Sequence, residues 1–272
     1  MSVLRRRGFK NLAALFVWNA VRRENGAGRN GELKSGRGRR KKIVDIVSEM
    51  GYNHVDMMSE YHSRRTNMPK GSPERTAARK EEIINACEKL YQTMSFKDIT
   101  LKEIGSETSF SRPTIYNYFQ TREEIFLALF EREYVRWNEE LQRILLDNTS
   151  LTKEQIADKL ATSLANRGQL LKLLAMNNYD MEANSRPELL TSFKVAYGNS
   201  MKSVRGILSK FCPEKSAQEI QSIIYVFFPF MFGIYPYTSV TQKQREAMTA
   251  ANADFVYQSV YEITDNCLRK LL

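Results

Sequence analysis

A run of polar and aromatic side chains in the first half of the chain has the residue types of a surface that reads DNA bases. Its members are Ser111, Arg112, Pro113, Thr114, Tyr116, Asn117 and Tyr118. Ser111 can cap a short helix whose first turn holds Arg112 and Pro113. Ile115 and Phe119 then form the buried i, i+4 pair, so the other side chains face the open side, Tyr116 in part. Arginine can read guanine edges in the major groove, and hydroxyl or methyl groups can meet thymine.

Two earlier helices and one later helix must hold this segment in place. Ser72-Pro73 starts a helix that runs to about Thr93, with its apolar face at Ile83, Ala86, Cys87, Leu90 and Met94. Thr100 and Glu103 form a capping box that opens a short second helix, with Leu101 and Ile104 turned inward. Thr121 and Glu124 form a second capping box, which starts a long helix through Trp137, Leu141 and Ile144. Three such helices, with a tight turn between the second and the third, predict a helix-turn-helix.

Several of these residues have a purely structural alternative. Thr100 and Thr121 are expected first as helix caps, although a cap hydroxyl at a helix start can also contact DNA. Tyr116 has the alternative of packing wholly in the core against the first helix. Arg122, at a helix N-terminus with exposed backbone N–H groups, is the expected phosphate contact.

Residues 75–130, and above all ITLKEIGSETSFSRPTIYNYFQTREEIFLALF at 99–130, resemble the DNA-binding head of the TetR/AcrR family of bacterial transcriptional regulators. The resemblance implies groove and backbone contacts from Arg112, Pro113, Thr114, Tyr116, Asn117 and Tyr118. It further implies contacts from Thr100 and Lys102 of the second helix, and a phosphate contact from Arg122, where the family usually has lysine. Gly105 stands where alanine is usual, and Thr108-Ser109-Phe110 replaces Ala-Gly-Val, so Ser109 is expected to adopt a turn geometry normally assigned to glycine.

The charge of the chain is concentrated at its N-terminal end. The 272 residues carry a formal net charge of +10, but residues 1–72 hold 16 Lys/Arg and 6 Asp/Glu, whereas residues 73–272 hold 25 of each. The predicted head is near neutral, with 8 Lys/Arg and 9 Asp/Glu over residues 73–130. The DNA-binding prediction therefore depends on placement and not on overall charge.

The basic N-terminal segment, residues 1–72, is expected to be a largely disordered extension. Residues 5–23 form an amphipathic helical stripe with basic flanks, which leaves membrane-surface binding or targeting as alternatives. A third alternative is that the segment is not translated and that the protein starts at Met68, because Arg64-Arg65-Thr66-Asn67 could be encoded by a sequence like a ribosome-binding site.

The rest of the chain keeps a helical pattern, with helices predicted over 152–165, 168–183, 187–211, 216–234 and 243–272. The run from Ile223 to Tyr237 is interpreted as a core helix and not as a membrane span. The expected fold is all-α: a helix-turn-helix domain over residues 73–122, and a helical effector-binding and dimerisation domain over residues 123–272. By analogy with the family, helices around 216–235 and 243–272 would form a four-helix dimer interface.

Aromatic and apolar residues of the second domain are candidates for the lining of an effector cavity, although core packing is the more common role of such residues. They are Trp137, Leu141, Met176, Tyr179, Phe193, Tyr197, Tyr225 and Phe228. Their nature suggests a hydrophobic or aromatic effector.

The sequence predicts a cytoplasmic, homodimeric regulator, a repressor that a small-molecule effector releases from double-stranded operator DNA. Residues 73–272 contain no histidine, and Cys87, Cys212 and Cys267 lie far apart, so neither a His-based catalytic group nor a zinc site is indicated. No metal, no other cofactor and no catalytic residue is expected. The alternatives are a helical enzyme or lipid-binding protein whose helix-turn-helix is only scaffold, and a nucleoid-type or membrane-surface protein that binds through its basic segment.

Overall fold

The computed structural model describes residues 72–176 and 178–272, and all regular elements within these ranges are helices. The side chains of residues 178–180 are outside the description. The predicted basic extension lies outside the described residues, apart from Ser72. The all-α prediction is confirmed.

Three helices make up the N-terminal head: α4 (Pro73–Thr93), α5 (Leu101–Ser106) and α6 (Arg112–Ile115). Ser72 caps α4, since its side chain accepts a hydrogen bond from the N–H of Arg75 at 3.3 Å, and Pro73 occupies the first turn, where no N–H is needed. Ile83, Ile104 and Ile115 are fully buried, one from each helix. These three side chains hold the head together around one small apolar centre.

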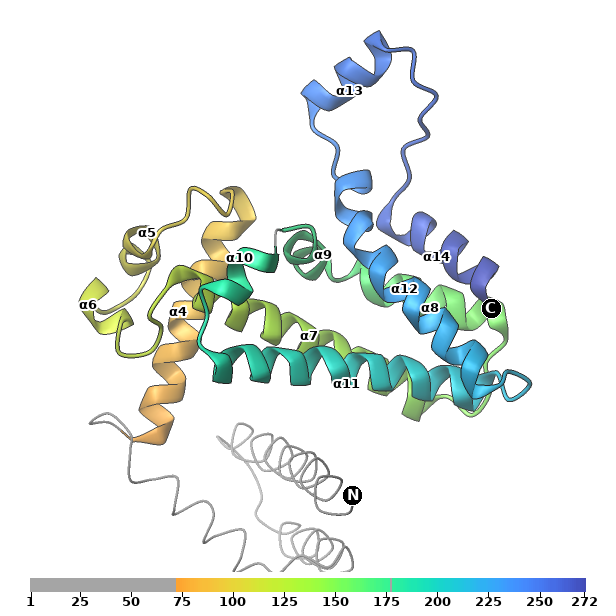
Figure 1. Cartoon of the computed structure of the whole chain (residues 1–272), viewed down its shortest axis with the longest axis horizontal. Helices are drawn as coiled ribbons and strands as arrows, with labels where there is room; N and C mark the ends of the chain where they lie inside the picture. The colour runs from red at the N-terminus through yellow and green to blue at the C-terminus, as the bar shows by residue number, and fades with distance from the viewer. Residues whose placement is uncertain (1–71, 177) are drawn as a thin grey trace, which may run out of the picture. The chain divides into compact units, whose positions relative to one another are not determined.

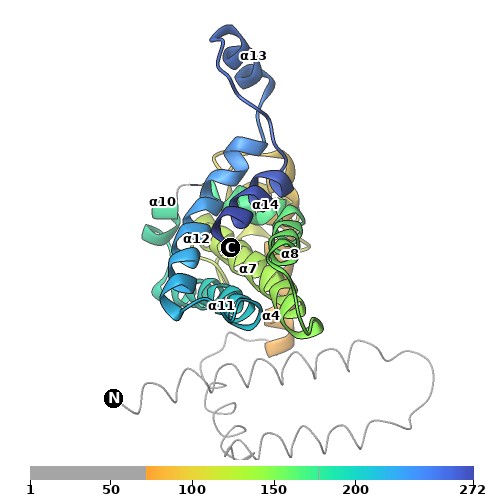
Figure 2. The same ribbon diagram turned by 90° about the vertical axis from the view of Figure 1, so that its right-hand side faces the viewer.

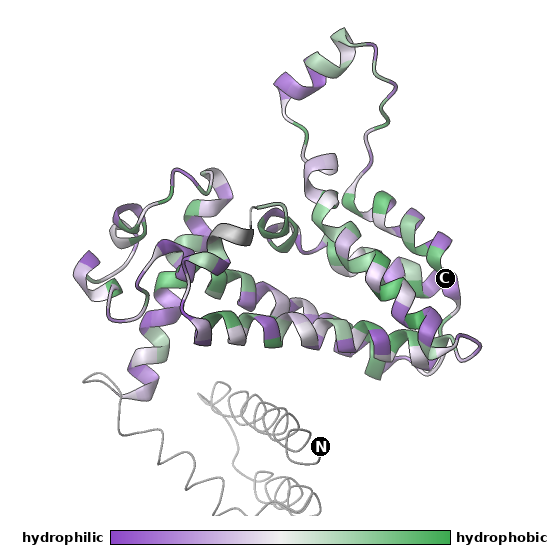
Figure 3. Ribbon diagram, in the orientation of Figure 1, coloured by the Kyte–Doolittle hydropathy of each residue, from purple (hydrophilic) through white to green (hydrophobic). Residues whose placement is uncertain are grey.

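Two long helices form the spine of the remaining residues, α7 (Arg122–Asp147) and α11 (Pro187–Phe211), which lie side by side in both views (Figures 1 and 2). Around them lie α8 (Lys153–Ala165), α9 (Gly168–Leu174), α10 (Asn178–Ala183), α12 (Ala217–Thr238) and α14 (Val260–Leu271). α14 packs on α8, and α12 packs on α9, α11 and α14. Four of the seven residues of α9 are buried leucines, and Figure 3 shows this helix in both hydrophobic and hydrophilic colours.

Two predicted helices are each divided in the structure. The segment 168–183 forms α9 and α10, with Ala175 as the C-cap of α9. The segment 243–272 was wrongly predicted as one helix, because it forms the short α13 (Gln242–Ala250), a non-helical return and then α14. Asn252 lies between them with φ 49°, a left-handed conformation that ends a helix. Both segments are helical on either side of the break, as the apolar spacing predicted. The position of each break depends on packing with other parts of the chain.

One helix, α12, runs without interruption through Pro229 and Pro236, beyond the predicted end at Ile234. Both prolines are exposed. The carbonyl groups that lose their helical N–H partners therefore face the solvent side, where water can bind them. Among the described residues, α12 alone is long and apolar enough to cross a membrane by length and composition, but seven of its residues are buried in the core.

Candidate nucleic-acid interface

The second helix of the head is set by its N-terminal cap. The hydroxyl of Thr100 accepts a hydrogen bond from the N–H of Lys102 at 3.1 Å, and the carboxylate of Glu103 accepts one from the N–H of Thr100 at 3.2 Å. Hydrogen bonds from Thr100 lower the pKa of Glu103, so the box is formed with the carboxylate ionised. The predicted capping box is confirmed, and it sets the residue at which α5 begins.

The outer face of α6 and the turn after it carry the predicted reading side chains. Arg112, Pro113 and Asn117 are exposed, and Tyr116 is 47% exposed. The alternative in which Tyr116 packs in the core is therefore wrong. Nη2 of Arg112 donates a hydrogen bond to the hydroxyl of Tyr116 at 3.1 Å. This pairing orients the guanidinium before any ligand arrives.

Three of the predicted contacts have roles inside the head. Ser111 occupies the N-cap position of α6 but makes no capping hydrogen bond, and its hydroxyl lies 3.3 Å from that of Thr114. Tyr118 is half-buried against the core, and its hydroxyl accepts a hydrogen bond from Nη1 of Arg79 at 3.3 Å. Tyr118 was expected toward the open side, and the structure has it partly buried, with its hydroxyl beside Arg79 of α4. Arg79 was not predicted at this site, and its cationic group lies beside the reading segment.

Arg122 has a different environment from the one predicted. Its Nη1 donates hydrogen bonds to the carbonyl oxygens of Phe96, Lys97 and Ile99 at 3.1, 3.3 and 3.2 Å, and its guanidinium lies 4.4 Å from the centre of the Phe96 ring. Its Nε pairs with Glu123 at 2.9 Å. The side chain thus holds the loop between α4 and α5. To contact a phosphate, Arg122 would have to give up some of these hydrogen bonds.

The turn between α5 and α6 does not need glycine. Ser109 does not have a positive φ, because Asn252 is the one non-glycine residue among those described that does. The N–H of Ser109 instead donates to the carboxylate of Glu82 on α4. Hydrogen bonds from the backbone and side chain of Ser109 lower the pKa of Glu82. The expected glycine-like geometry is wrong, and the tie to α4 shapes the turn.

Residues of the second domain bind the end of the reading segment through hydrogen bonds and an ion pair that the sequence did not predict. Glu124 is 1% exposed and binds the side chain of Arg186 through Nε at 2.7 Å and Nη2 at 3.0 Å. Nη2 of Arg186 also donates to the carbonyl oxygen of Tyr118 at 3.0 Å, and the hydroxyl of Thr121 donates to the carbonyl oxygen of Asn184 at 2.9 Å. We call these five residues the α10–α11 clamp.

The clamp also changes the second predicted capping box. Thr121 accepts from the N–H of Glu124 at 3.1 Å as predicted, but the Glu124 carboxylate reaches the N–H of Gln120 at 2.7 Å and Arg186. Burial acts to raise the pKa of Glu124, but hydrogen bonds from Arg186 and Gln120 outweigh it, so this pKa lies below its ordinary value. A charged carboxylate is therefore held in the clamp.

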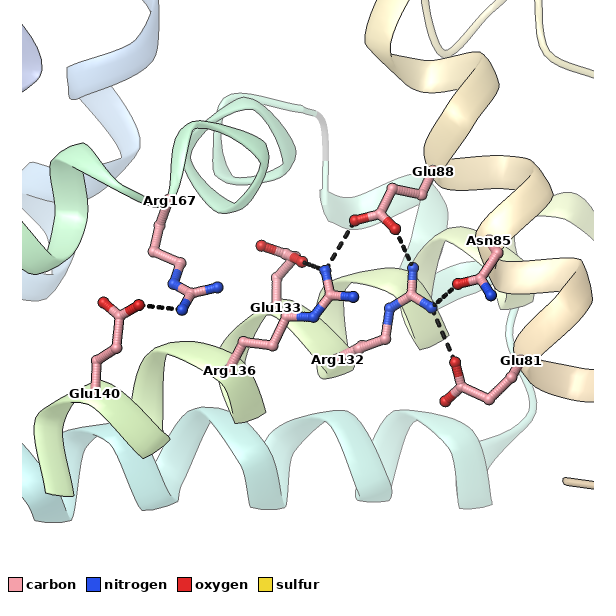
Figure 4. Close-up of polar contacts among 8 residues, drawn as sticks. All are labelled: Glu81, Asn85, Glu88, Arg132, Glu133, Arg136, Glu140 and Arg167. Carbon is pink, nitrogen blue, oxygen red and sulfur yellow. Dashed lines mark hydrogen bonds and ion pairs between the residues drawn. The ribbon is translucent and has the colours of Figure 1, made fainter. Parts of the chain in front are cut away.

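An ion network joins α4 to α7 (Figure 4). Arg132 donates to Glu81 at 3.0 Å, to Asn85 at 2.6 Å and to Glu88 at 2.8 Å. Arg136 binds Glu88 at 2.8 Å, which joins the two arginines through one carboxylate. Together with the clamp, this network fixes the head to the second domain at two separate places.

Comparison with known proteins gives the family. Residues 83–129 match the family model described as "Bacterial regulatory proteins, tetR family", and residues 131–257 match "Tetracyclin repressor-like, C-terminal domain". This chain is a TetR-family transcriptional regulator. The first model covers most of the head and ends within α7, and the second covers most of the remaining helices. The DNA-binding assignment follows from the first model and from the exposed face of α6.

Individual relatives of this TetR-family regulator are distant. The chain is 33% identical over 63 residues to "Uncharacterized HTH-type transcriptional regulator YfiR" of Bacillus subtilis (strain 168), which is 23% of this chain and 31% of that relative. A TetR-family transcriptional regulator from Mesorhizobium loti superposes with a TM-score of 0.50 at 18% identity, over 73% of this chain and 96% of that chain. The fatty acid degradation regulator FadR from Bacillus halodurans has a TM-score of 0.48 at 13% identity, over 75% and 97%. The chain covers under a third of the curated relative, and the structural likenesses concern the fold.

The candidate cavity residues of this TetR-family regulator divide into two groups. Trp137, Leu141, Phe193 and Phe228 are buried, and Met176 and Tyr197 pack partly buried against the core. Tyr225 is 65% exposed on the opposite face of α12, so its assignment to the cavity was wrong. The side chain of Tyr179 lies outside the described residues.

Aromatic side chains of α7, α11 and α12, among them Trp137 and Phe228, form a continuous cluster. The ring centres of Tyr197 and Phe228 are 5.6 Å apart, those of Trp137 and Phe228 5.8 Å, and those of Tyr134 and Tyr197 5.4 Å. Nε1 of Trp137 donates to the hydroxyl of Ser163 at 3.0 Å. A ligand that entered here would have to separate packed rings.

Proposed function

We propose that this TetR-family regulator is a homodimeric repressor that binds a palindromic operator and leaves it when a small-molecule effector binds. Residues 73–122 would bind DNA, and residues 123–272 would bind the effector and dimerise. The observation that carries the proposal is the outer face of α6, where Arg112, Tyr116 and Asn117 are exposed on a segment whose opposite side is buried. A rigid surface of this kind fits the major groove.

The chemistry of these side chains suggests how the bases are read. Arg112 can donate two hydrogen bonds to guanine, and Asn117 can bond adenine through its amide. Thr100, Lys102, Ser111, Pro113, Thr114 and Tyr118 would provide positioning contacts to the backbone of the duplex. Because the head is near neutral, we expect modest affinity for random DNA and a larger share of the binding energy from base contacts.

The outer face of α12 supports the homodimer. Tyr225, Val226, Phe232 and Tyr237 are all exposed at helical spacing, together with Pro229 and Pro236, and form an apolar stripe. The opposite face is covered by the chain itself, as expected for a helix that is apolar nearly all round. In a homodimer, two such stripes would form a self-complementary contact, with the same face of α12 contributed by each subunit.

Release by an effector would use the connections between the two domains. The aromatic cluster is the proposed effector site, and Phe193 and Tyr197 belong to α11, the helix that starts just after Arg186. A ligand that separates α7 from α11 would therefore move the α10–α11 clamp and with it the end of the reading segment. The effector can act only by binding the released form more tightly than the DNA-bound form. We place this action in the cytoplasm, without catalysis, without a cofactor and without stable membrane insertion.

Selection of bound fragments from a random DNA pool tests the proposal. We expect a palindrome whose half-sites lie about one helical turn apart, and loss of enrichment when the correct lipophilic effector is added. Enrichment without a palindrome, or none at all, would contradict the regulator proposal and favour a helical ligand-binding protein or enzyme in which the helix-turn-helix is scaffold.

Deletion of residues 1–67 separates the regulator from a protein that binds through its basic segment. We expect operator binding to survive the deletion with reduced affinity for random DNA, since this segment holds most of the excess charge. Complete loss of operator binding would assign recognition to the basic segment.

A further inference from the structure

The segment between α12 and α14 projects from the rest of the second domain. In Figures 1 and 2 residues 239–259, with α13 at the tip, extend beyond the ends of α12 and α14. None of the nine residues of α13 is buried, and Val256 on the return is 77% exposed. We call residues 239–259 the arm.

The helix of the arm, α13, has hydrogen-bonded caps at both ends, although none of the described residues of its own subunit buries it. The hydroxyl of Thr241 accepts from the N–H of Gln244 at 3.2 Å. At the other end, Asn252 has φ 49°, its N–H donates to the carbonyl oxygen of Thr249 at 3.1 Å, and the N–H of Ala253 donates to that of Met248 at 3.0 Å. This is a complete Schellman motif. A helix of nine residues is only marginally stable in water by itself, so contact with another chain would stabilise it.

The base of the arm holds it in a defined direction. The ring centres of Tyr237 and Phe255 are 6.0 Å apart, those of Phe255 and Tyr257 are 5.0 Å apart, and the guanidinium of Arg245 lies 4.4 Å from the centre of the Tyr257 ring. These contacts join the outgoing and returning parts of the arm. Tyr237 also ends the apolar stripe of α12, so the arm continues the proposed dimer interface.

Symmetry indicates where the arm would lie. The reading helices α5 and α6 are at one end of the α7–α11 spine, and α12 crosses that spine in Figure 1. For both heads of the proposed dimer to lie on one side, the two-fold axis must run roughly along the spine. Rotation by 180° about such an axis reverses the direction of α12, so the two α12 helices are antiparallel. The stripe extends from Tyr225 to Tyr237, with Met231 at its midpoint. In an antiparallel pair whose centre lies at the level of residue 231, the end of α12 at Thr238 lies level with residue 224 of the partner, so the arm that follows extends alongside the partner's residues before 224.

A surface hollow occupies the region to which the arm would point. It has a volume of about 420 Å³ and is lined by Lys215 and Ser216 before α12, by Gln218, Glu219 and Ser222 in its first two turns, and by Leu271 at the end of α14. Ile223 forms its floor and is 6% exposed. Apart from Leu271, the lining residues lie between positions 215 and 223, the stretch alongside which the arm of the partner would extend.

We propose that the arm of one subunit docks on a second copy of this chain, over the hollow at the start of α12. Each dimer would contain two such contacts, one at each end of the paired α12 helices. This inference rests on the proposed homodimer and adds a second contact to it, outside the α12 stripe.

Photo-cross-linking on the full chain tests this docking. A benzophenone amino acid replaces the exposed Ala247 of α13 in chains with natural isotopes, and these are mixed with ¹⁵N-labelled chains without the probe. We expect cross-linked peptides that join position 247 to residues 213–223 of the labelled chain. The same probe at the exposed Glu139 of α7 is the matched control and should give no cross-link to this region.

The outcomes separate the arm from the dimer. Cross-links within one chain only, or to another region of the partner, would overturn the arm proposal while sedimentation still shows a dimer. A chain that sediments as a monomer at all concentrations would overturn the homodimer itself.

Replacement of residues 241–258 by a Gly-Ser linker provides a second measurement. The dimer dissociation constant should rise by about tenfold or more, as when a few apolar side chains leave an interface. An unchanged constant would also overturn the arm proposal.

Discussion

The α10–α11 clamp makes a quantitative prediction for Arg186→Ala. This substitution leaves the Glu124 carboxylate 1% exposed and without its cation, although the N–H groups of Gln120 and residue 186 still reach it. Breaking a buried ion pair from one side costs about 3–5 kcal/mol. Because the Arg186 side chain is itself 34% exposed and water can replace part of it, we expect a value near the lower end, about 3 kcal/mol.

Thermal unfolding followed by circular dichroism measures this loss. For about 200 folded residues, a loss of about 3 kcal/mol lowers Tm by about 6–12 °C. Lys194→Ala is the matched control, since the pair of Lys194 with Glu182 is solvent-exposed on both sides, and we expect about 0.2–1 kcal/mol for it. A loss for Arg186→Ala no larger than that of the control would refute the reasoning, because the clamp would then be a screened surface pair.

The pH dependence of the clamp gives an independent check. The pKa of Glu124 lies below its ordinary value of 4.5 in the folded protein, so its stabilisation is complete above about pH 4.5 and is lost as the pH falls through the folded-state pKa. The stability difference between the wild type and Glu124→Gln should therefore narrow on acidification. Urea unfolding at neutral pH and at successively lower pH values measures this difference. If the stability difference widened toward low pH, the pKa of Glu124 would be raised in the folded protein and the reasoning would be wrong.

The remaining predictions concern DNA binding and assembly. Arg112→Ala should cost about 1–3 kcal/mol of operator affinity and relax specificity at one base pair, as measured by competition with single-base operator variants; equal losses for all sequences would make Arg112 a phosphate contact. Arg122→Ala should lower Tm, because three carbonyl oxygens lose a charged donor, and should leave the salt dependence of binding unchanged. A salt slope that falls by about one unit with Tm unchanged would instead restore its predicted phosphate contact. Val226→Asp should give a folded monomer by sedimentation, since it adds a charge to the α12 stripe; a stable dimer would place the interface elsewhere.

The head could be predicted in detail because its rules are local. The cap at Ser72, the capping box at Thr100 and the buried pair of Ile115 and Phe119 follow from residues within one turn of each other. Arg112 and Asn117 are exposed for the same reason, since they lie opposite that pair. Such positions depend on helical spacing alone, which the sequence shows directly.

Several roles depended on residues far apart in the chain. Arg122 was assigned to phosphate from its position at a helix start, yet its partners are Phe96, Lys97 and Ile99. Glu124 was expected to complete a local cap and is instead bound by Arg186, 62 residues away. Tyr225 was grouped with the buried aromatic residues, although helical rotation places it on the outer face of α12.

The amino-acid sequence by itself determined the helices, the helix-turn-helix and the family, because caps and apolar spacing act over a few residues. Only the tertiary structure decided which charged groups join the two domains, which face of α12 is left open, and that residues 243–272 divide into an arm and a packed helix. A long charged side chain can reach several partners at similar local cost, and a helix that is apolar nearly all round has no preferred buried face. In both cases the choice belongs to the packing of elements that are distant in the chain.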